Sequence, residues 1–276
     1  MFTGYGFKEF FTYKGVFREV FGYSGQDYDG PGRMIYLGVS IALVILLCIL
    51  FRKAKHEHIK IYLRVLGIVM LAMNIGKFAW ETYFDIASGE GFNIYILPFD
   101  TCSIVVWAAL LAGFAKGPFK LSGETWLATI GIAGGISNLL FLQALKYYPF
   151  FTFGAFYSMI WHFVMVFTGF FLVVTGYVEL NFKTVLTSFI LHMIISVPVI
   201  ILDYAQGIDF MLYLSAGGVP VFEGIAEKLN GAGLNAVTTL MMVAVYFGVD
   251  AMLVYLFRLV RFLYRLASKK LTRKTA

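Results

Sequence analysis

Hydrophobic and polar positions divide this chain into seven long apolar stretches joined by shorter polar segments. An α-helix needs roughly 20 predominantly apolar residues to cross ~30 Å of hydrocarbon, and each stretch has about that length. The stretches cover residues 34–51, 61–83, 94–115, 126–145, 150–177, 185–204 and 236–264. The ~10-residue alternating strands of a membrane β-barrel do not occur in this pattern. The pattern therefore predicts an all-α, polytopic membrane protein with seven transmembrane helices.

Composition supports this class, because 60 % of the 276 residues are hydrophobic and only 14 % are charged. Such a chain has too many hydrophobic side chains for one soluble core. No internal repeat or low-complexity segment divides it. We therefore expect a single transmembrane domain over residues 34–265, flanked by residues 1–33 and 266–276.

The positive charges predict the orientation. The net charge of +6 comes mainly from the first loop, "RKAKHEHIK", and from residues 258–274, and cationic segments stay on the cytoplasmic side of a membrane. The third loop carries Lys116 and Lys120, whereas the second, "DIASGEGFN", is acidic. We expect the N-terminus outside, the C-terminus inside and residues 266–276 as a basic cytoplasmic tail. This placement fits a bacterial cytoplasmic membrane and suggests no nucleic acid partner.

Two polar segments are predicted on the outer face. Residues 1–33 lack an uninterrupted apolar core, so no cleavable signal peptide is expected. The stretch "GFKEFFTYKGVFREVFGY" is typical of an amphipathic helix in the membrane interface, with a lid folded onto the protein as an equal alternative. The sixth loop, residues 205–235, exceeds the usual loop length, which favours a second lid.

Ionisable side chains inside predicted spans each need a partner, a cavity or a function, because inserting one costs about 2.5–3.5 kcal/mol. They are Lys77, Glu81, Asp100, His162, His192, Asp203 and Asp250. The predicted orientation places all but His192 and Asp250 in the outer half, together with Cys102. We interpret His192 and Asp250, near mid-membrane, as buried polar links. Asn138, in the glycine-rich fourth span, is either interhelical glue or a site residue.

The thiol and the imidazole suggest nucleophilic chemistry. A thiol becomes a nucleophile when an imidazole takes its proton, and a third group orients the ring. Cys102 and His162 provide the pair, and Asp100, Glu81 or Asp203 could orient the ring. Asp100 and Cys102 share a pocket only if the turn after Pro98 is non-helical, which proline makes possible.

Other uses of these residue types are less favoured. The two cysteines, Cys48 and Cys102, lie in different spans, so we expect no disulfide. The sequence "HEH" at 56–58 puts its histidines on different helix faces among cations, so we expect no metal site, and no cofactor is required.

Three motifs occur in the order found in a known family: "ILPFDTCSI", then "SMIWHFVMVFTG", then "LDYAQGIDFMLYL". Together they resemble the YwaF-like bacterial membrane proteins, the family to which animal transmembrane protein 164 belongs. The resemblance covers roughly residues 34–265. It implies a cysteine-dependent acyltransferase that moves fatty acyl chains between phospholipids, with distant kinship to intramembrane threonine hydrolases. In that case Cys102 is the acyl carrier and His162 the base.

The chain departs from the family motifs at three positions. Asp100 stands where the third-span motif has histidine, and Asp203 and Asp209 stand where the family has asparagine. These changes make the predicted pocket more anionic, which disfavours a phospholipid phosphate unless Lys77 offsets the charge. Glu81, Asn138, Asp203 and Asp209 join Lys77 as candidate substrate-binding residues.

Three functions follow from these observations. The first is an intramembrane acyltransferase or lipid hydrolase acting on phospholipid acyl esters, with backbone N–H groups near Pro98 or Asn138 as oxyanion donors. The second is a cation or small-solute transporter whose outer vestibule is lined by acidic residues and in which His162 relays protons. The third is a non-catalytic membrane subunit that has kept the fold. Membrane phospholipids are the expected partners of the first, and the sequence leaves the oligomeric state open.

Overall fold

The computed structural model describes residues 7–19, 22–88, 92–217 and 220–274, which contain helices and no strand. Within these ranges seven segments are long and apolar enough to cross a membrane. They are Pro31–Phe51, His56–Ala87, Ile94–Phe114, Gly117–Lys146, Phe153–Val174, Phe182–Gln206 and Asn235–Leu263. The predicted all-α fold with seven spans is confirmed, while the orientation of the termini stays a prediction.

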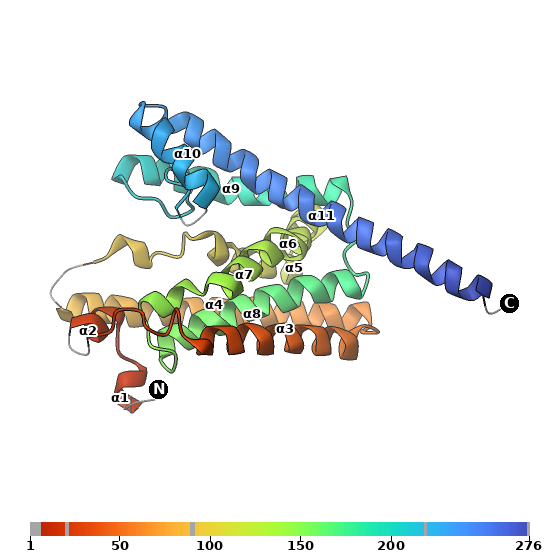
Figure 1. Cartoon of the computed structure of the whole chain (residues 1–276), viewed down its shortest axis with the longest axis horizontal. Coiled ribbons are helices and arrows are strands. Elements are labelled where there is room, and N and C mark those ends of the chain that lie inside the picture. Colours follow the sequence, from red (N-terminus) through yellow and green to blue (C-terminus); the bar gives the residue numbers. More distant parts are fainter. Residues whose placement is uncertain (1–6, 20–21, 89–91, 218–219, 275–276) are drawn as a thin grey trace.

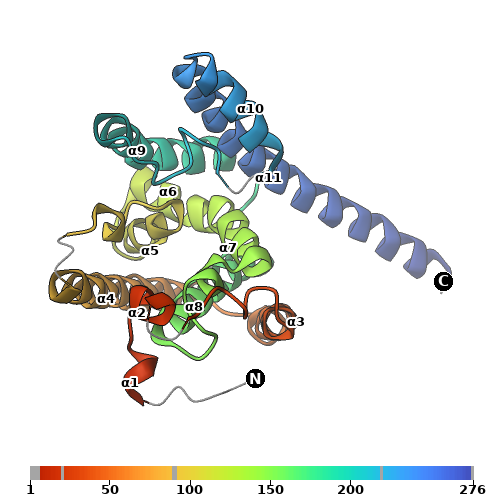
Figure 2. The same cartoon turned by 60° about the vertical axis from the view of Figure 1, so that its left-hand side comes forward.

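The helices form three layers (Figure 2). One layer holds α3 (Pro31–Phe51), α4 (His56–Ser88) and α8 (Phe153–Val174). The middle layer holds α5 (Ile104–Phe114), α6 (Gly117–Ala128) and α7 (Ile130–Phe141). The last layer holds α9 (Phe182–Gln206), α10 (Pro220–Gly231) and α11 (Asn235–Lys274). The middle layer joins the other two, because α5 packs on α4 and α7 on α8, while α6 packs on α9.

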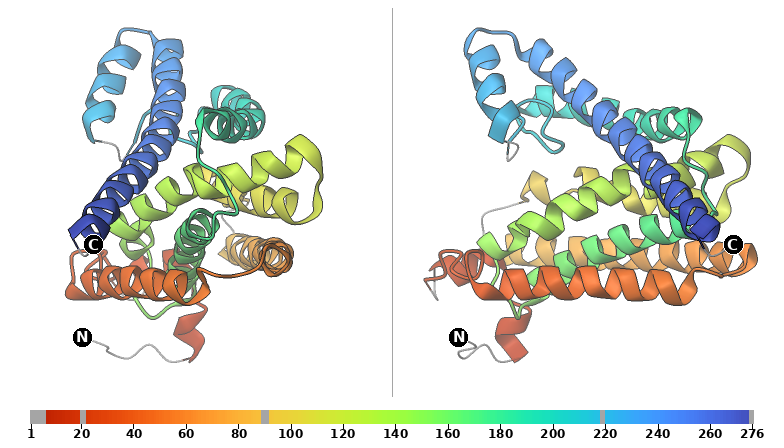
Figure 3. Two further views of the ribbon diagram at one scale, coloured as in Figure 1. Left: turned by 90° about the vertical axis from the view of Figure 1, so that its right-hand side faces the viewer. Right: turned by 45° about the vertical axis from the view of Figure 1, so that its right-hand side comes forward.

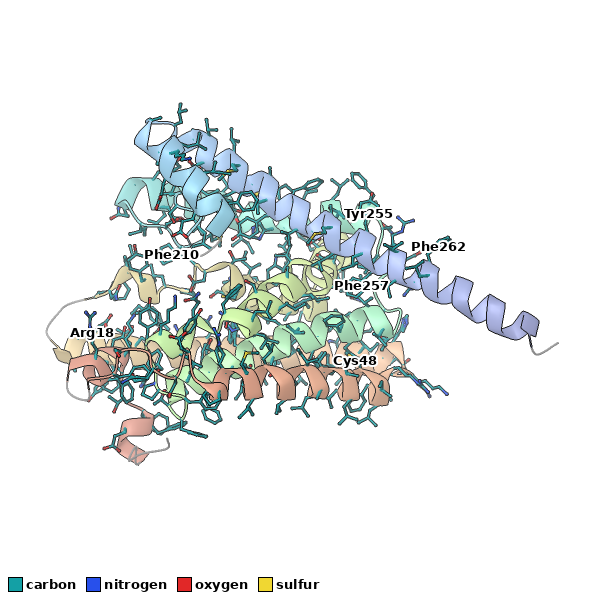
Figure 4. All side chains as sticks on the ribbon, in the orientation of Figure 1. Arg18, Cys48, Phe210, Tyr255, Phe257 and Phe262 are labelled. Atoms are coloured by element: carbon teal, nitrogen blue, oxygen red, sulfur yellow. The ribbon has the colours of Figure 1, made fainter. Side chains whose placement is uncertain are left out.

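The last helix, α11, is much longer than a membrane span. Its 40 residues correspond to about 60 Å at 1.5 Å per residue, and its end projects beyond the other helices (Figure 1). Figure 3 shows that it crosses the other layers obliquely. In Figure 4, Phe257 faces the bundle, where its ring packs 5.5 Å from that of Phe170. Tyr255 and Phe262 are more than half exposed. The predicted tail therefore continues the seventh helix as far as Lys274.

Two spans are broken helices. The third begins with two single 3₁₀ turns, η1 (Ile94–Ile96) and η2 (Thr101–Ser103), before α5 starts. The fourth consists of α6, α7 and the 3₁₀ turn η3 (Gln143–Lys146). The break between α6 and α7 lies at Thr129, whose φ of −132° and ψ of −87° are not helical.

The fourth span starts at Gly117, well before the predicted residue 126. The prediction stopped at the polar sequence "KLSGET", which reads as a loop. In the structure Lys120 and Glu124 form an i, i+4 ion pair of 3.3 Å, so both charges are compensated on the helix. Pro118 lies in the first turn of α6, where its missing N–H costs nothing.

Small residues let the middle layer pack closely. A Cβ added at Gly123 would lie 2.4 Å from the carbonyl oxygen of Ala108 on α5. One added at Gly135 would lie 2.6 Å from Val166 on α8. These are the short interhelical approaches that small residues permit in membranes.

The two segments predicted on the outer face, the N-terminal segment and the sixth loop, both pack on the bundle. The N-terminal segment forms two short helices, α1 (Phe7–Phe10) and α2 (Lys14–Glu19), rather than one amphipathic helix. Phe17 is fully buried and packs 6.4 Å from the ring of Tyr148. In the sixth loop Phe210 is buried against Phe99, with ring centroids 5.4 Å apart, so this loop covers the broken start of the third span.

Candidate functional site

The break in the third span presents Asp100 and Cys102 side by side. Leu97 and Asp100 both have extended backbone, and Cys102 lies in the η2 turn that follows. The turn after Pro98 is therefore non-helical, which is the condition under which Asp100 and Cys102 can share a pocket. Asp100 is exposed and Cys102 partly exposed, although both belong to a membrane span. The break therefore opens a polar site in the predicted outer half of the span.

Two other helices hold this break in place. The indole Nε1 of Trp161 on α8 donates a hydrogen bond to the Cys102 carbonyl oxygen at 3.2 Å. From α11, the Tyr246 hydroxyl is 2.9 Å from Thr101 Oγ1 and donates to the Met211 carbonyl oxygen at 3.0 Å. Backbone groups that lack helical partners must be satisfied by neighbours at membrane depth, and these side chains do part of that.

Charged side chains from three spans surround the break. Lys77 and Glu81, one turn apart on α4, form an ion pair of 2.5 Å. Asp100 is close enough to interact electrostatically with both of them and with Asp203. Cys102 likewise interacts with Asp100 and Lys77. The structure thus brings together most of the residues that the sequence placed in the outer half.

The Cys102 sulfur lies against backbone N–H groups. Those of Cys102 itself and of Ser103 are its hydrogen-bonding neighbours. They belong to the first turn before α5, where the helix dipole places partial positive charge. Such N–H groups can donate hydrogen bonds to an oxyanion formed next to the sulfur.

His162 is buried with one ring nitrogen available. It is 5 % exposed, and Nδ1 lies 2.7 Å from the Ser158 carbonyl oxygen. Because a carbonyl only accepts, Nδ1 carries the hydrogen and Nε2 carries a lone pair. Nε2 is buried and has no hydrogen-bond partner among the described residues. It therefore forms no hydrogen bond to Cys102 in this structure.

The group that orients the ring differs from the three predicted carboxylates. The Ser158 carbonyl, one turn earlier on the same helix, holds Nδ1, so Asp100, Glu81 and Asp203 are not needed for that role. A carbonyl four residues back lies within reach of a side chain on any helix. A carboxylate from another helix must instead match both depth and rotation.

Two of the predicted substrate-binding acids are engaged by backbone. Asp203 is fully buried and accepts hydrogen bonds from the Phe210 N–H at 3.2 and 3.3 Å. Asp209 accepts from the N–H groups of Leu214 and Ser215 at 3.2 and 2.8 Å. These carboxylates organise the start of the sixth loop. Asn138 has a buried Oδ1 without a hydrogen-bond partner in the described part of the chain.

An apolar groove begins next to the break. It has a volume of about 500 Å³ and runs between the third span and α9. Its lining includes Pro98, Phe99, Ile104, Trp107, Ile194 and Leu202. Trp107 and Ile194 are more than half exposed, so the groove opens toward the lipid-facing surface. Its shape and lining suit a hydrocarbon chain.

With this geometry in view, the comparisons assign the chain to a family. The sequence model of the TMEM164 family matches residues 28–244. The chain belongs to the TMEM164 family. No curated protein and no solved structure matches it. The matched range contains every candidate site residue of this TMEM164-family protein, whereas Asp250 lies beyond it.

Sequence reasoning missed three residues of the site. Ser158 and Trp161 lie in the "SMIWHF" motif beside His162, so helical spacing from the histidine could have identified them. Tyr246 has no local signal, because it lies 145 residues from its partner Thr101. Among the described residues no group of three or more histidine, cysteine or acidic side chains could hold a metal ion.

Proposed function

We propose that this TMEM164-family protein is an intramembrane acyltransferase or lipid hydrolase that acts on phospholipid acyl esters. Cys102 is the nucleophile and His162 the general base. Phospholipids are then its partners, and a bacterial cytoplasmic membrane is the proposed location. No cofactor takes part in the chemistry.

One observation carries the proposal most directly: the unpartnered, buried Nε2 of His162. A buried polar atom without a partner is costly, which makes such an atom a candidate for function. The nitrogen belongs to the residue next to Trp161, whose indole holds the Cys102 peptide. His162 thus adjoins in sequence the residue that anchors the Cys102 peptide. Among the described residues Cys102 is the one cysteine that is partly exposed, since Cys48 is buried.

The reaction divides into two transfers. In the first, Cys102 Sγ attacks the ester carbonyl carbon, its proton passes to His162 Nε2, and backbone N–H groups of the η2 turn stabilise the oxyanion. Collapse breaks the ester C–O bond, and the imidazolium returns the proton to the departing lysophospholipid oxygen. In the second, His162 deprotonates a lipid hydroxyl or water, which attacks the thioester and releases the Cys102 thiol.

The surroundings of the break fit such a substrate. The apolar groove starts at Pro98 and Phe99, a few residues before Cys102, and can take the acyl chain. Lys77, whose side chain is 34 % exposed, is the cation nearest the break and can meet the phosphate. Its pairing with Glu81 keeps it fixed within the span. We also propose Asn138 as a donor, because its side-chain amide nitrogen can donate a hydrogen bond to the oxyanion.

The experiment is intact mass spectrometry of the purified protein after incubation with mixed phospholipids. We expect an acyl adduct on the native chain that disappears on treatment with hydroxylamine, which cleaves thioesters. The adduct should be absent in Cys102→Ala and strongly reduced in His162→Ala. Cys48→Ala and His56→Ala are the matched controls, because they remove the same residue types elsewhere.

The controls decide between the outcomes. An adduct that persists in Cys102→Ala would remove the proposed nucleophile. Lack of both an adduct and lipid turnover in a folded native chain would favour a non-catalytic subunit. The transporter alternative is less well supported, because Glu81 is paired with Lys77 and Asp203 is held by backbone.

A further inference from the structure

A second groove lies between α3, α7 and α8 and has a volume of about 670 Å³. In Figure 2, α3 lies at the edge of its layer, beside α8 and below α7. It packs mainly on α8 and much less on α7, so a space remains between α3 and α7. The residues around this space include Leu37, Val44, Cys48, Arg52, Leu139 and Phe170.

The lining of this groove is apolar except at one end. Apart from Cys48 and Arg52, all its residues are aliphatic or aromatic, and a buried cysteine behaves as a small hydrophobic residue. Arg52 follows the last residue of α3 and is exposed. The ion pairs among the described residues do not include it. The groove beside Pro98, by contrast, has no charged residue in its lining.

The groove is long enough for a lipid chain. Leu37 and Arg52 are lining residues near the two ends of α3, and at 1.5 Å per residue they lie about 22 Å apart along the helix axis. One leaflet supplies half of the ~30 Å of hydrocarbon in a membrane. A chain whose head is held at Arg52 can therefore follow the groove through the full depth of its leaflet.

The charges around Arg52 favour a head group with net negative charge. Residues 52–60, "RKAKHEHIK", contain four lysine or arginine residues and one acid. On α11, the ring of Phe257 packs 5.5 Å from that of Phe170, and the exposed Arg261 lies one turn later on the same face. A guanidinium binds phosphate oxygens in a bidentate manner, and the surrounding cations attract anionic lipids and repel a choline group.

We propose that this groove binds an anionic phospholipid, with its phosphate at Arg52 and one acyl chain between α3 and α7. Such a lipid supplies contacts that the protein lacks there. Only 17 % of the most apolar stretch of the first span is buried, compared with 61 % in the fifth span, which forms another wall of the groove. The bound lipid thus fastens α3 to the bundle.

This lipid is distinct from the proposed substrate. Lys77, beside the break in the third span, lies about 32 Å along α4 from His56, which follows closely after Arg52 in the chain. The groove and the break are therefore at opposite ends of the bundle. The inference does not rest on the proposed acyl transfer.

The test of the head group is native mass spectrometry of the purified full chain in detergent, with dioleoylphosphatidylglycerol and dioleoylphosphatidylcholine added in equal amounts. The two lipids have the same chains and differ only in head group. We expect the native chain to retain the phosphatidylglycerol preferentially. Arg52→Gln should bind it about fivefold more weakly, whereas Lys53→Gln, which changes an exposed cation outside the groove, should lose much less.

The test of the groove itself is a pair of tryptophan variants. Ile45 lines the groove, while its neighbour Leu46 does not, and the side chains of both are about half exposed. Added phosphatidylglycerol should raise the melting temperature of the native chain and of Leu46→Trp in a saturable way, and have little effect on Ile45→Trp, where the indole occupies the groove.

Several results would overturn the proposal. They are equal retention of the two lipids, equal losses in Arg52→Gln and Lys53→Gln, or equal melting shifts in the two tryptophan variants. A dimer that Ile45→Trp disrupts would show that a second copy of the chain occupies the groove instead. Cys102→Ala should bind the lipid as the native chain does, and loss of binding there would identify the lipid as the substrate of the break.

Discussion

Two spans of this protein are interrupted, and the two interruptions differ in what they expose. The break before Ile104 in the third span leaves Asp100 exposed and Cys102 partly exposed beside an apolar groove. The break at Thr129 in the fourth span is fully buried, with Thr129, Ser188 and Asp250 inaccessible.

This difference follows from what covers each break. Helices on both sides enclose the fourth span, because α6 packs between α5 and α9 while α7 packs on α8. The third span has its extended segment at one end, covered by the sixth loop through Phe210. The exposed break is therefore the one that we propose for chemistry with lipids, whereas the buried break contributes to packing. Variants of each should therefore change different quantities.

The largest effect is expected at the exposed break. Cys102→Ser keeps the size of the side chain but replaces the thiol, so acyl transfer should fall by more than about a thousandfold. The melting temperature should stay that of the native chain, because the serine hydroxyl can accept the same backbone hydrogen bonds as the sulfur. Turnover of a fluorescent phospholipid checks this, with Cys48→Ala as the control. Loss of folding in Cys102→Ser would mean that this break, too, is structural.

A somewhat smaller effect is expected for the base. His162→Gln removes the Nε2 lone pair and should lower acyl transfer about 10²- to 10⁴-fold, as loss of a general base does. The same turnover assay measures it, with His56→Gln as the control at the exposed start of α4. An unchanged rate would show that the His162 imidazole takes no part in the reaction and only contributes to packing.

A substitution in the buried fourth span should change the stability of the protein. In Gly123→Ala the new Cβ would lie 2.4 Å from the Ala108 carbonyl oxygen, which is backbone and cannot turn aside. We expect the free energy of unfolding to fall by about 1–3 kcal/mol, with unchanged acyl transfer per folded molecule. Denaturation in detergent tests this.

Gly134→Ala is the matched control, because the nearest atom to its Cβ is the flexible Met165 Cε at 3.6 Å. Equal stability of the two alanine variants would contradict the close packing of α5 on α6.

The smallest effect is expected at Tyr246, which links α11 to the exposed break in the third span. Tyr246→Phe removes a hydroxyl that contacts Thr101 Oγ1 and the Met211 carbonyl oxygen. We expect a loss of about 1 kcal/mol in the free energy of unfolding, as for one interhelical hydrogen-bonding group. Tyr255→Phe, at an exposed tyrosine of the same helix, should change nothing measurable in the same melting experiment. A larger loss for Tyr255→Phe would reverse the assignment.

Much of the fold and part of the site could be predicted from sequence. The seven spans follow from the length of the apolar stretches, and the irregular start of the third span from Pro98. Shared depth placed Lys77, Glu81, Asp100 and Asp203 in one half of the predicted bundle, and the structure brings them within electrostatic reach of one another. Depth did not predict that Asp203 accepts a hydrogen bond from the Phe210 N–H, or that His162 Nδ1 donates one to the Ser158 carbonyl oxygen.

The sequence by itself determined the class of protein, the number of spans and the depth of each polar residue, because hydrophobic length and proline act locally along the chain. Only the tertiary structure decided which polar groups meet. That Thr129 Oγ1 meets Ser188 Oγ, and that the Trp161 indole holds the Cys102 carbonyl, depend on the rotation of each helix about its axis. Packing against distant segments sets this rotation, and in a span that is apolar on all sides the hydrophobic pattern does not specify it.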